Sequence, residues 1–159
     1  MADVVSPEVR SRMMSGIRGK NTKPEMVIRR GLHARGFRYL LHDKRLRGKP
    51  DLVFPKHRAV IFVHGCFWHG HDCHLFKWPK SRKGFWRKKI ERNREIDENA
   101  LASLKKSGWR CGSVWECAIK GRTRSSESKI IQKLENWIRS SAPKIELKGT
   151  HRAAKRRSS

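Results

Sequence analysis

The sequence predicts a single α/β or α+β domain in which one central sheet is sandwiched between helices. A chain of 159 residues has the length of one domain with a substantial core. Its helical and strand patterns follow one another in the order helix, three strands, helix, strand, helix. We expect this domain to span residues 21–141, between a basic arm at residues 1–20 and a basic, disordered tail at residues 142–159.

The first half of the domain is expected to contain a helix and then three strands. Residues 22–25, with the sequence Thr-Lys-Pro-Glu, form a capping box that starts the helix, and Gly36 ends it. Large apolar side chains alternate over residues 37–41, as in a strand. Two further short strands, at residues 51–54 and 59–63, are close enough in the chain to form a hairpin.

The second half is expected to contain a long helix, a strand and a last helix. The long helix spans residues 82–106, and its partial apolar stripe includes Ile96. A strand follows at residues 109–115. Either Ser125 or Ser126 caps the last helix. The apolar residues that form the buried face of this last helix are Ile130, Ile131, Leu134, Trp137 and Ile138.

The charge balance predicts a polyanionic partner. The chain has 39 Lys and Arg residues against 14 Asp and Glu residues, which gives a net charge of +25. This excess is larger than solubility requires, so nucleic acid is the simplest partner, and its binding should weaken steeply with salt. A basic protein without a specific partner is the alternative.

The sequence gives no sign of secretion or membrane insertion. Residues 1–20 lack the apolar region of a signal peptide, and no apolar run approaches the length needed to span a bilayer. We therefore expect the reducing cytoplasm. In that compartment, cysteines near histidines are more often metal ligands than disulfide partners.

Residues 64–74 combine histidines and cysteines directly after a predicted buried strand. Three ligands for one metal ion lie in this loop, and a fourth must come from elsewhere. Cys117 follows another strand and can lie at its end, whereas Cys111 would lie inside that strand as a small hydrophobic residue. We expect structural zinc, with cysteines scattered in the core as the alternative. The expected zinc ligands are Cys66, His71, Cys73 and Cys117.

A second arrangement is typical of nucleases. Asp51 starts the predicted hairpin, and the next strand ends at Val63 and His64. Many enzymes that cut DNA place an Asp at this position to hold magnesium beside the scissile phosphate, with an acid and a Lys on the next strand. Here the second acid is missing, and His64 stands where the Lys would be. The alternative is that Asp51 is only a turn residue.

Several motifs together resemble those of the very short patch repair endonucleases, which are bacterial DNA mismatch endonucleases. The resemblance covers residues 8–140. It implies a restriction-endonuclease-like, three-layer fold with a central mixed sheet and a structural zinc site. It also implies magnesium-dependent nicking 5′ to the T of a T·G mismatch that arises from deamination of 5-methylcytosine. The motifs are Pro50-Asp51, the run from His64 to His69, His71-x-Cys73, Phe85-Trp86 and Trp115-Glu116-Cys117.

The resemblance also implies roles for individual residues. Asp51 and the main chain of Val63 would hold magnesium, although some family members have Thr at the position of Val63. His64 and His69 would be active-site histidines. Glu25 would be the acid that orients His69, with helix capping as its alternative role. The same comparison supports the four zinc ligands proposed above.

A third set of residues would contact DNA. Two aromatic residues lie between zinc ligands and one lies at the start of the long helix, where they would enter the base stack beside the mismatch. Their alternative role is packing in the core. The implied DNA contacts are Met14, Phe67, Trp68, Trp86, Lys89 and Asn93.

Two functions from different classes therefore compete. One is a monomeric nicking enzyme that acts on double-stranded DNA and is functionally linked to other mismatch repair proteins. The other is a zinc-stabilised DNA-binding module that has lost catalysis, which the missing second acid would allow. We leave His42 as a surface or structural residue.

Overall fold

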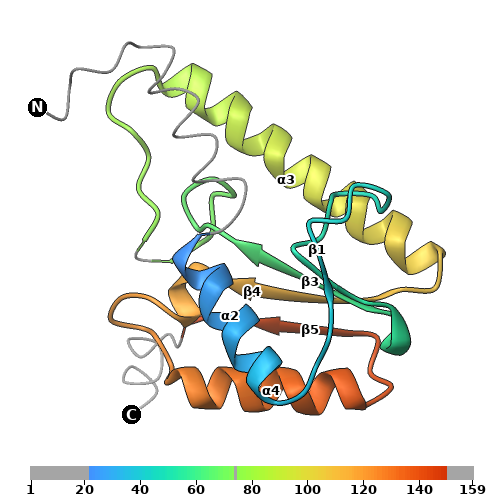
Figure 1. Ribbon diagram of the computed structural model, residues 1–159. Coiled ribbons are helices and arrows are strands. Elements are labelled where there is room, and N and C mark those ends of the chain that lie inside the picture. Colours follow the sequence, from blue (N-terminus) through green and yellow to red (C-terminus); the bar gives the residue numbers. More distant parts are fainter. Residues whose placement is uncertain (1–21, 74, 150–159) are drawn as a thin grey trace, which may run out of the picture.

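The structure is a computed structural model that describes residues 22–73 and 75–149. These residues form a five-stranded mixed sheet in the order β1-β2-β3-β4-β5, flanked by three α-helices (Figure 1). The expected α/β class is therefore confirmed. Met14 and the rest of the expected arm lie outside the described residues.

The sheet changes from antiparallel to parallel at its centre. Strand β2 pairs antiparallel with both β1 and β3, which confirms the predicted hairpin. Strand β4 pairs parallel with both β3 and β5. The strands are β1 Leu40–Leu41, β2 Leu52–Phe54, β3 Ala59–His64, β4 Arg110–Trp115 and β5 Lys144–Leu147.

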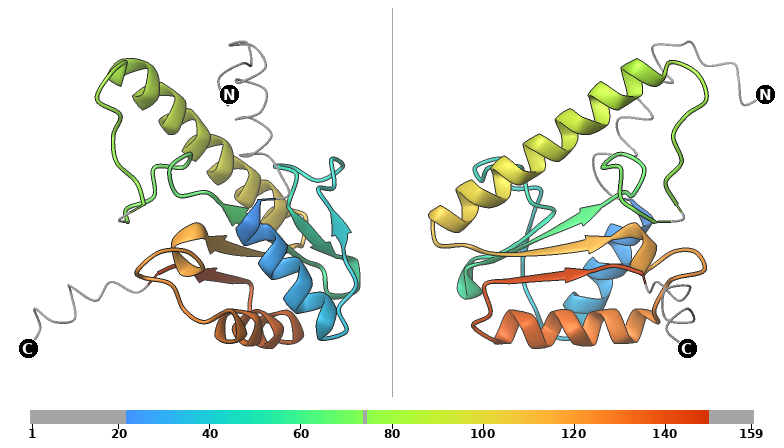
Figure 2. Two further views of the ribbon diagram at one scale, coloured as in Figure 1. Left: turned by 60° about the vertical axis from the view of Figure 1, so that its left-hand side comes forward. Right: turned by 180° about the vertical axis from the view of Figure 1, so that it is seen from behind.

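The helices cover both faces of the sheet. Helices α2 (Lys23–Ala34) and α4 (Glu127–Arg139) pack together on one face, and α3 (Lys83–Lys106) crosses the other (Figure 2). The first turns of α3 extend past the sheet. Short 3-10 helices follow β2 and β4, namely η2 (Pro55–His57) and η3 (Glu116–Ala118).

Alternation along β3 divides its side chains between two cores. Ala59 and Ile61 pack with α2 and α4, whereas Val60 and Phe62 pack under α3. Continuing the alternation, His64 falls on the α3 side, and its ring stacks on Phe62 with centroids 5.8 Å apart. The strand therefore delivers a histidine to the space between the sheet and α3.

Strand β5 corrects the expected boundary of the tail. Lys144–Leu147 was expected to belong to a disordered segment that begins at residue 142, but it pairs with β4 at the edge of the sheet. The segment was missed because an edge strand of four residues, two of them charged, carries too little apolar alternation to be recognised. Residues 150–159 lie outside the described part of the chain.

The apolar stripe of α3 also differs from the expected one. Ile96 is 47% exposed, while Ile90, Ala100 and Leu104 are buried. The buried face follows the spacing of three and four residues through those positions, and Ile96 falls off it. Among the described residues, no helix has both the length and the apolar character needed to span a membrane.

Candidate functional site

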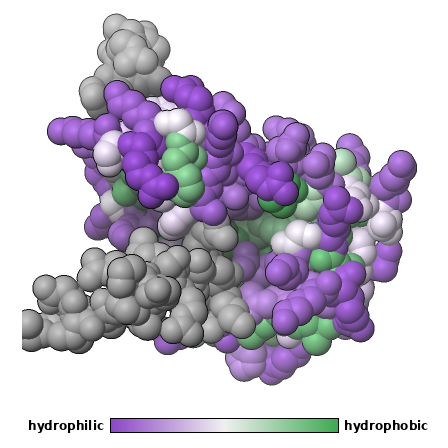
Figure 3. Space-filling model, turned by 90° about the horizontal axis from the view of Figure 1, so that it is seen from above, coloured by the Kyte–Doolittle hydropathy of each residue, from purple (hydrophilic) through white to green (hydrophobic). Residues whose placement is uncertain are grey.

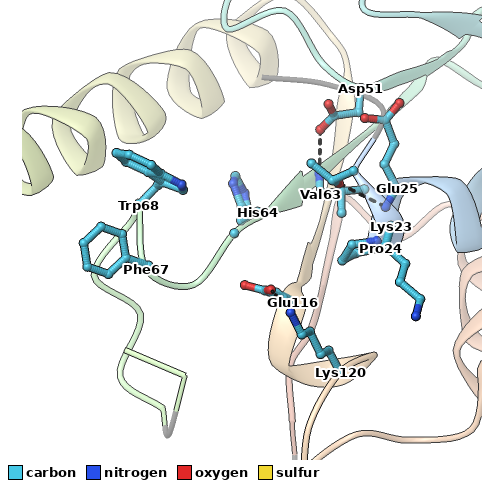
Figure 4. A pocket seen from close by; sticks show the side chains of 12 residues that line it. Lys23, Pro24, Glu25, Asp51, Val63, His64, Phe67, Trp68, Glu116 and Lys120 are labelled. Atoms are coloured by element: carbon cyan, nitrogen blue, oxygen red, sulfur yellow. Dashed lines mark hydrogen bonds and ion pairs between the residues drawn. The ribbon is translucent and has the colours of Figure 1, made fainter. Parts of the chain in front are cut away.

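A cavity of about 340 Å³ lies where β3 ends and α2 begins. Figure 4 shows the carboxylates of Glu25 and Asp51 at one end of this cleft and the rings of Phe67 and Trp68 at the other, with His64 between them. These residues come from α2, the start of β2, the end of β3 and the loop that follows. The sheet therefore brings together the predicted catalytic residues and two of the predicted DNA contacts.

A buried carboxylate and a half-buried one lie at one end of the cleft, within reach of a histidine. Asp51 Oδ2 accepts a hydrogen bond of 2.7 Å from the main-chain N–H of Val63. Glu25 is only 1% exposed and accepts a bond of 2.7 Å from His42 Nε2, which lies 4.0 Å from Asp51 Oδ1. The ligand atoms of Glu25, His42 and Asp51 all lie within 4.8 Å of one another.

The carboxyl end of the cleft is suited to a cation. The pKa of Asp51 is raised from 3.8 to about 7, mainly by burial and in part by the charge of Glu25, against the opposing effect of the Val63 amide. A divalent cation would relieve both costs, and carboxylate oxygens are the donors that magnesium prefers. The main-chain N–H of Val63 donates a hydrogen bond to Asp51. The role of the Val63 carbonyl as a magnesium ligand stays a prediction.

The environment of Glu25 corrects one expectation. Glu25 was expected to orient His69, but its carboxylate binds His42, a residue we had left as structural. Helix capping does occur, because the side chain of Thr22 accepts a bond of 3.3 Å from the Glu25 main-chain N–H. That bond uses the backbone of Glu25, so capping does not explain the buried position of its carboxylate.

A histidine pair with its own acid lies beside the cleft. The rings of His64 and His69 are 4.7 Å apart, and His69 Nδ1 forms a hydrogen bond with Asp97 on α3. The pKa of His64 is lowered to about 3, mainly by burial and in part by the neighbouring His69. Asp97 was missed in the sequence. The signal for it was a polar side chain on the buried face of α3, four residues after Asn93.

His64 connects the cleft to a second cavity. This cavity, of about 410 Å³, is lined by His64, His69, Asp97 and Trp115, among other residues. His64 therefore contacts both spaces, with the carboxylates on one side and the His69–Asp97 pair on the other.

The four predicted zinc ligands come together. Their ligand atoms all lie within 4.8 Å of one another, and His71 Nδ1 is 3.5 Å from the Sγ atoms of both Cys66 and Cys117. Tetrahedral zinc with ordinary bond lengths separates a nitrogen and a sulfur ligand by about 3.5 Å. Cys111, as expected, is buried in β4 and packs in the core under α3. The residues present therefore fit zinc.

Of the cysteines in this cluster, Cys117 is shifted toward the form that binds metal. A hydrogen bond from the Cys66 thiol lowers the pKa of Cys117 to about 4, and His71 contributes in the same direction against the effect of burial. The hydrogen bond with Cys117, together with burial, raises the pKa of Cys66, and burial raises the pKa of Cys73. The thiolate is the form of cysteine that binds zinc.

Residues 65–73, which carry three of the four predicted zinc ligands, are called the zinc loop. The predicted aromatic residues form one cluster between this zinc loop and α3. Phe67 contacts Trp68 and Trp86 with ring centroids 5.3 Å apart in each case, and Trp68 lies 5.9 Å from Trp86. Asn93 Nδ2 donates a bond of 2.7 Å to the Trp68 carbonyl, so Asn93 holds the loop in place. Phe76 extends the cluster and was missed in the sequence.

The surface around this cluster is basic. Figure 3 shows that the side of the molecule on which α3 lies is largely hydrophilic, with small apolar areas. Lys89 is half-buried on α3, in a helix whose first half carries many other basic side chains.

Comparison with known proteins identifies the family. The family model described as DNA mismatch endonuclease Vsr matches residues 2–75. The chain is 39% identical to the DNA mismatch endonuclease Vsr of Escherichia coli over 95% of this chain and 98% of that protein. It is 50% identical to the type II nicking enzyme V.XorIIP of Xanthomonas oryzae over 75% of this chain and 88% of that protein. The type II nicking enzyme V.NmeAIP of Neisseria meningitidis is 40% identical over 87% of this chain. With such identity along nearly its whole length, the chain belongs to the DNA mismatch endonuclease Vsr family.

Proposed function

We propose that this protein is a magnesium-dependent DNA mismatch endonuclease. It nicks one strand 5′ to the T of a T·G mismatch left by deamination of 5-methylcytosine, in very short patch repair. The observation that carries the proposal is the cleft itself, because carboxylates suited to a catalytic cation and rings suited to the base stack line the same cavity. The names of the relatives, mismatch endonuclease and nicking enzyme, agree with this reading.

The carboxyl end of the cleft would hold the cation. Asp51 is the principal ligand, with Glu25 beside it and the main-chain carbonyl of Val63 as a further donor. Magnesium bound there would neutralise charge on the scissile phosphate. His42 would keep the Glu25 carboxylate in place through its bond of 2.7 Å.

His69 would accept the proton of the attacking water, and His64 would contact the phosphate. Because Asp97 holds His69 at Nδ1, the Nε2 atom of His69 is left to accept a proton from the attacking water. His64, whose pKa of about 3 keeps it neutral at physiological pH, would contact the phosphate as a hydrogen-bonding group without a charge. Its position between the two cavities lets it connect the carboxylates to His69.

The aromatic cluster would recognise the mismatch. Inserting rings between bases costs a few kcal/mol of stacking per step, and a wobble pair that stacks poorly reduces this cost. The zinc ligands on both sides of Phe67 and Trp68, together with the bond from Asn93, would hold these rings in place before DNA binds. Trp86, Lys89 and Met14 would complete the DNA contacts.

The remaining expectations belong to the same proposal. The layers of helix, mixed sheet and helix agree with a restriction-endonuclease-like fold. The protein would act as a monomer in the cytoplasm, with a functional link to other mismatch repair proteins. Its zinc ion would be structural.

A nicking assay tests the proposal against the DNA-binding alternative. A duplex with one T·G pair and a different label on each strand is incubated with and without magnesium, and a T·A duplex is the control. We expect one nick, on the T strand, 5′ to the mismatched T, only with magnesium. Tight binding to the T·G duplex without any nick would instead identify a binding module that has lost catalysis.

A further inference from the structure

The chain after β5 reaches the predicted zinc site directly. The main-chain N–H of Gly149 donates a buried hydrogen bond of 3.2 Å to Cys117 Sγ. A bond from an N–H group stabilises the thiolate form of a cysteine and fixes its direction. Cys117 therefore has a partner from the last described residue of the chain, in addition to its neighbours in the cluster.

The position of Gly149 leaves no room for a side chain. A Cβ atom there would lie 2.1 Å from Thr123 Oγ1 and 2.6 Å from the main-chain oxygen of Cys117. Thr123 Oγ1 itself donates a bond of 3.0 Å to that same oxygen. Glycine thus permits the close approach that brings its N–H to the sulfur.

Strand β5 supports a second ligand through Trp115. Glu146 on β5 accepts a bond of 2.8 Å from the indole N–H of Trp115. The Trp115 ring stacks on the zinc ligand His71 with centroids 4.0 Å apart and planes 7° apart. Its other contacts include His64, with centroids 4.6 Å apart. The indole thus lies against both a predicted zinc ligand and a predicted catalytic histidine.

We propose that Glu146 and Gly149 are positioning residues of the zinc site, through which the C-terminal strand holds the loop that carries Phe67 and Trp68. Gly149 fixes the Cys117 thiolate, and Glu146 fixes Trp115 against His71. The inference rests on the proposed zinc site and not on the proposed reaction. It gives β5, missed as a tail in the sequence, a role in holding the loop that carries Phe67 and Trp68.

The first test concerns Gly149. Zinc release from the full-length protein to a coloured chelator is measured for the parent, Gly149→Ala, Gly149→Pro and the exposed neighbour Lys148→Ala. Both Gly149 variants add a Cβ atom, but only proline also removes the N–H group. Loss of an outer-shell partner typically costs about 10- to 100-fold in metal affinity. We expect Gly149→Pro to lose more zinc affinity than Gly149→Ala, and Lys148→Ala to match the parent.

The second test concerns Glu146 and does not depend on the crowded position 149. The zinc is replaced by Co²⁺, whose thiolate charge-transfer and visible bands report the geometry of the ligands. We expect Glu146→Ala to shift these bands and to release metal several-fold faster. Glu146→Gln, which can still accept from the indole, should restore the parent values. Lys144→Ala, on the same strand two residues earlier, is the matched control.

The outcomes separate this inference from the proposed function. Parent-like release and parent-like cobalt spectra in both Gly149→Pro and Glu146→Ala would overturn it, as would a parent protein that binds no zinc. The metal measurements need no DNA, so a failure to nick T·G duplexes would remove the proposed function and leave this inference standing.

Discussion

Two residues at the cleft have pKa values that differ from those of free side chains. Asp51 lies beside Glu25 in a largely enclosed position that penalises its charge, and its pKa rises to about 7. His64 is buried, and its pKa falls to about 3. Burial disfavours the charged form in both cases, so an empty site contains a protonatable acid and a neutral histidine.

The shifted pKa of Asp51 predicts how stability changes with pH. In the unfolded chain Asp51 ionises near 3.8, and in the folded protein near 7, so the folded state binds more protons between these values. The metal-free protein should therefore lose stability as the pH rises from about 4 to about 7. Urea midpoints at pH 5 and pH 7.5 measure this, and Asp51→Asn should show a smaller loss. An unchanged pH dependence in that variant would contradict the assignment.

Asp51→Asn should also separate binding from chemistry. The amide is a poorer ligand for magnesium, while the aromatic cluster stays intact. We expect nicking of a T·G duplex to fall by at least about 10²-fold, with duplex affinity within a few-fold of the parent. Single-turnover nicking and a gel-shift titration measure the two effects. Undiminished nicking would mean that the catalytic metal binds elsewhere.

Asp97 should act through His69. Asp97→Asn removes the carboxylate that holds His69 at Nδ1, so Nε2 is no longer positioned to accept a proton from the attacking water and nicking should fall by about 10²-fold. The exposed residue Glu95 on α3 provides the control, because Glu95→Gln removes the same charge at a position that lines neither cavity. A shift in the pH profile of nicking for Asp97→Asn alone would support the pairing, and equal effects of the two variants would argue against it.

At the scale of elements, the zinc loop and α3 form one unit. The aromatic rings belong to two segments that are distant in the sequence, and the bond from Asn93 to the Trp68 carbonyl joins these segments. The first turns of α3 extend past the sheet, so Trp86 meets the loop away from the main core. This arrangement exposes part of each ring while the rest is packed.

Trp68→Ala should affect mismatched DNA selectively. Stacking of a base on an aromatic ring is worth roughly 1–3 kcal/mol, so affinity for a T·G duplex should fall by roughly 5- to 150-fold and affinity for a T·A duplex much less. Fluorescence anisotropy with both duplexes measures the difference. Trp78→Ala is the control, since Trp78 is 43% exposed and does not line the cavity that Phe67 and Trp68 line. Equal losses on both duplexes would assign Trp68 to folding or to general affinity.

At the scale of the whole molecule, the predicted zinc site joins the loop after β3 to the end of β4. Cys117→Ala should abolish zinc binding and lower the melting temperature by several degrees, because the loop loses its link to η3. Cys111→Ala should keep the zinc, although it also leaves a small cavity in the core. Metal analysis and thermal unfolding of both variants test the ligand set. Full zinc retention in Cys117→Ala would remove the assignment.

The net charge of +25 should dominate binding to any duplex. Affinity for a T·A duplex should fall steeply between low and physiological salt, because each neutralised phosphate releases counterions. The preference for T·G should change little over the same range, since phosphate contacts carry no sequence information. Titrations at several salt concentrations measure both quantities, and a flat salt dependence would mean that the surface charge does not bind DNA.

Local patterns in the sequence were enough to predict much of the fold and part of the candidate site. The helix start at Thr22, the hairpin after Asp51 and the last helix depend on capping and periodicity within short segments, and the structure contains all three. Three of the predicted zinc ligands lie within one loop, and Cys117 could be added because it follows a strand. Spacing along the chain was sufficient to predict which residues meet wherever those residues are close in sequence or lie at the ends of strands.

Only the tertiary structure decided which distant side chains meet. His42 binds Glu25 and Asp97 binds His69, and neither pair has a pattern in the sequence because α2, α3 and the loops meet only across the packed sheet. Strand β5 could not be recognised from the sequence either, because a short, half-polar segment at the sheet edge forms a strand only through its pairing with β4. Its approach to Cys117 and Trp115 follows from that pairing, since the parallel register carries the chain to the end of the sheet where the predicted zinc ligands lie.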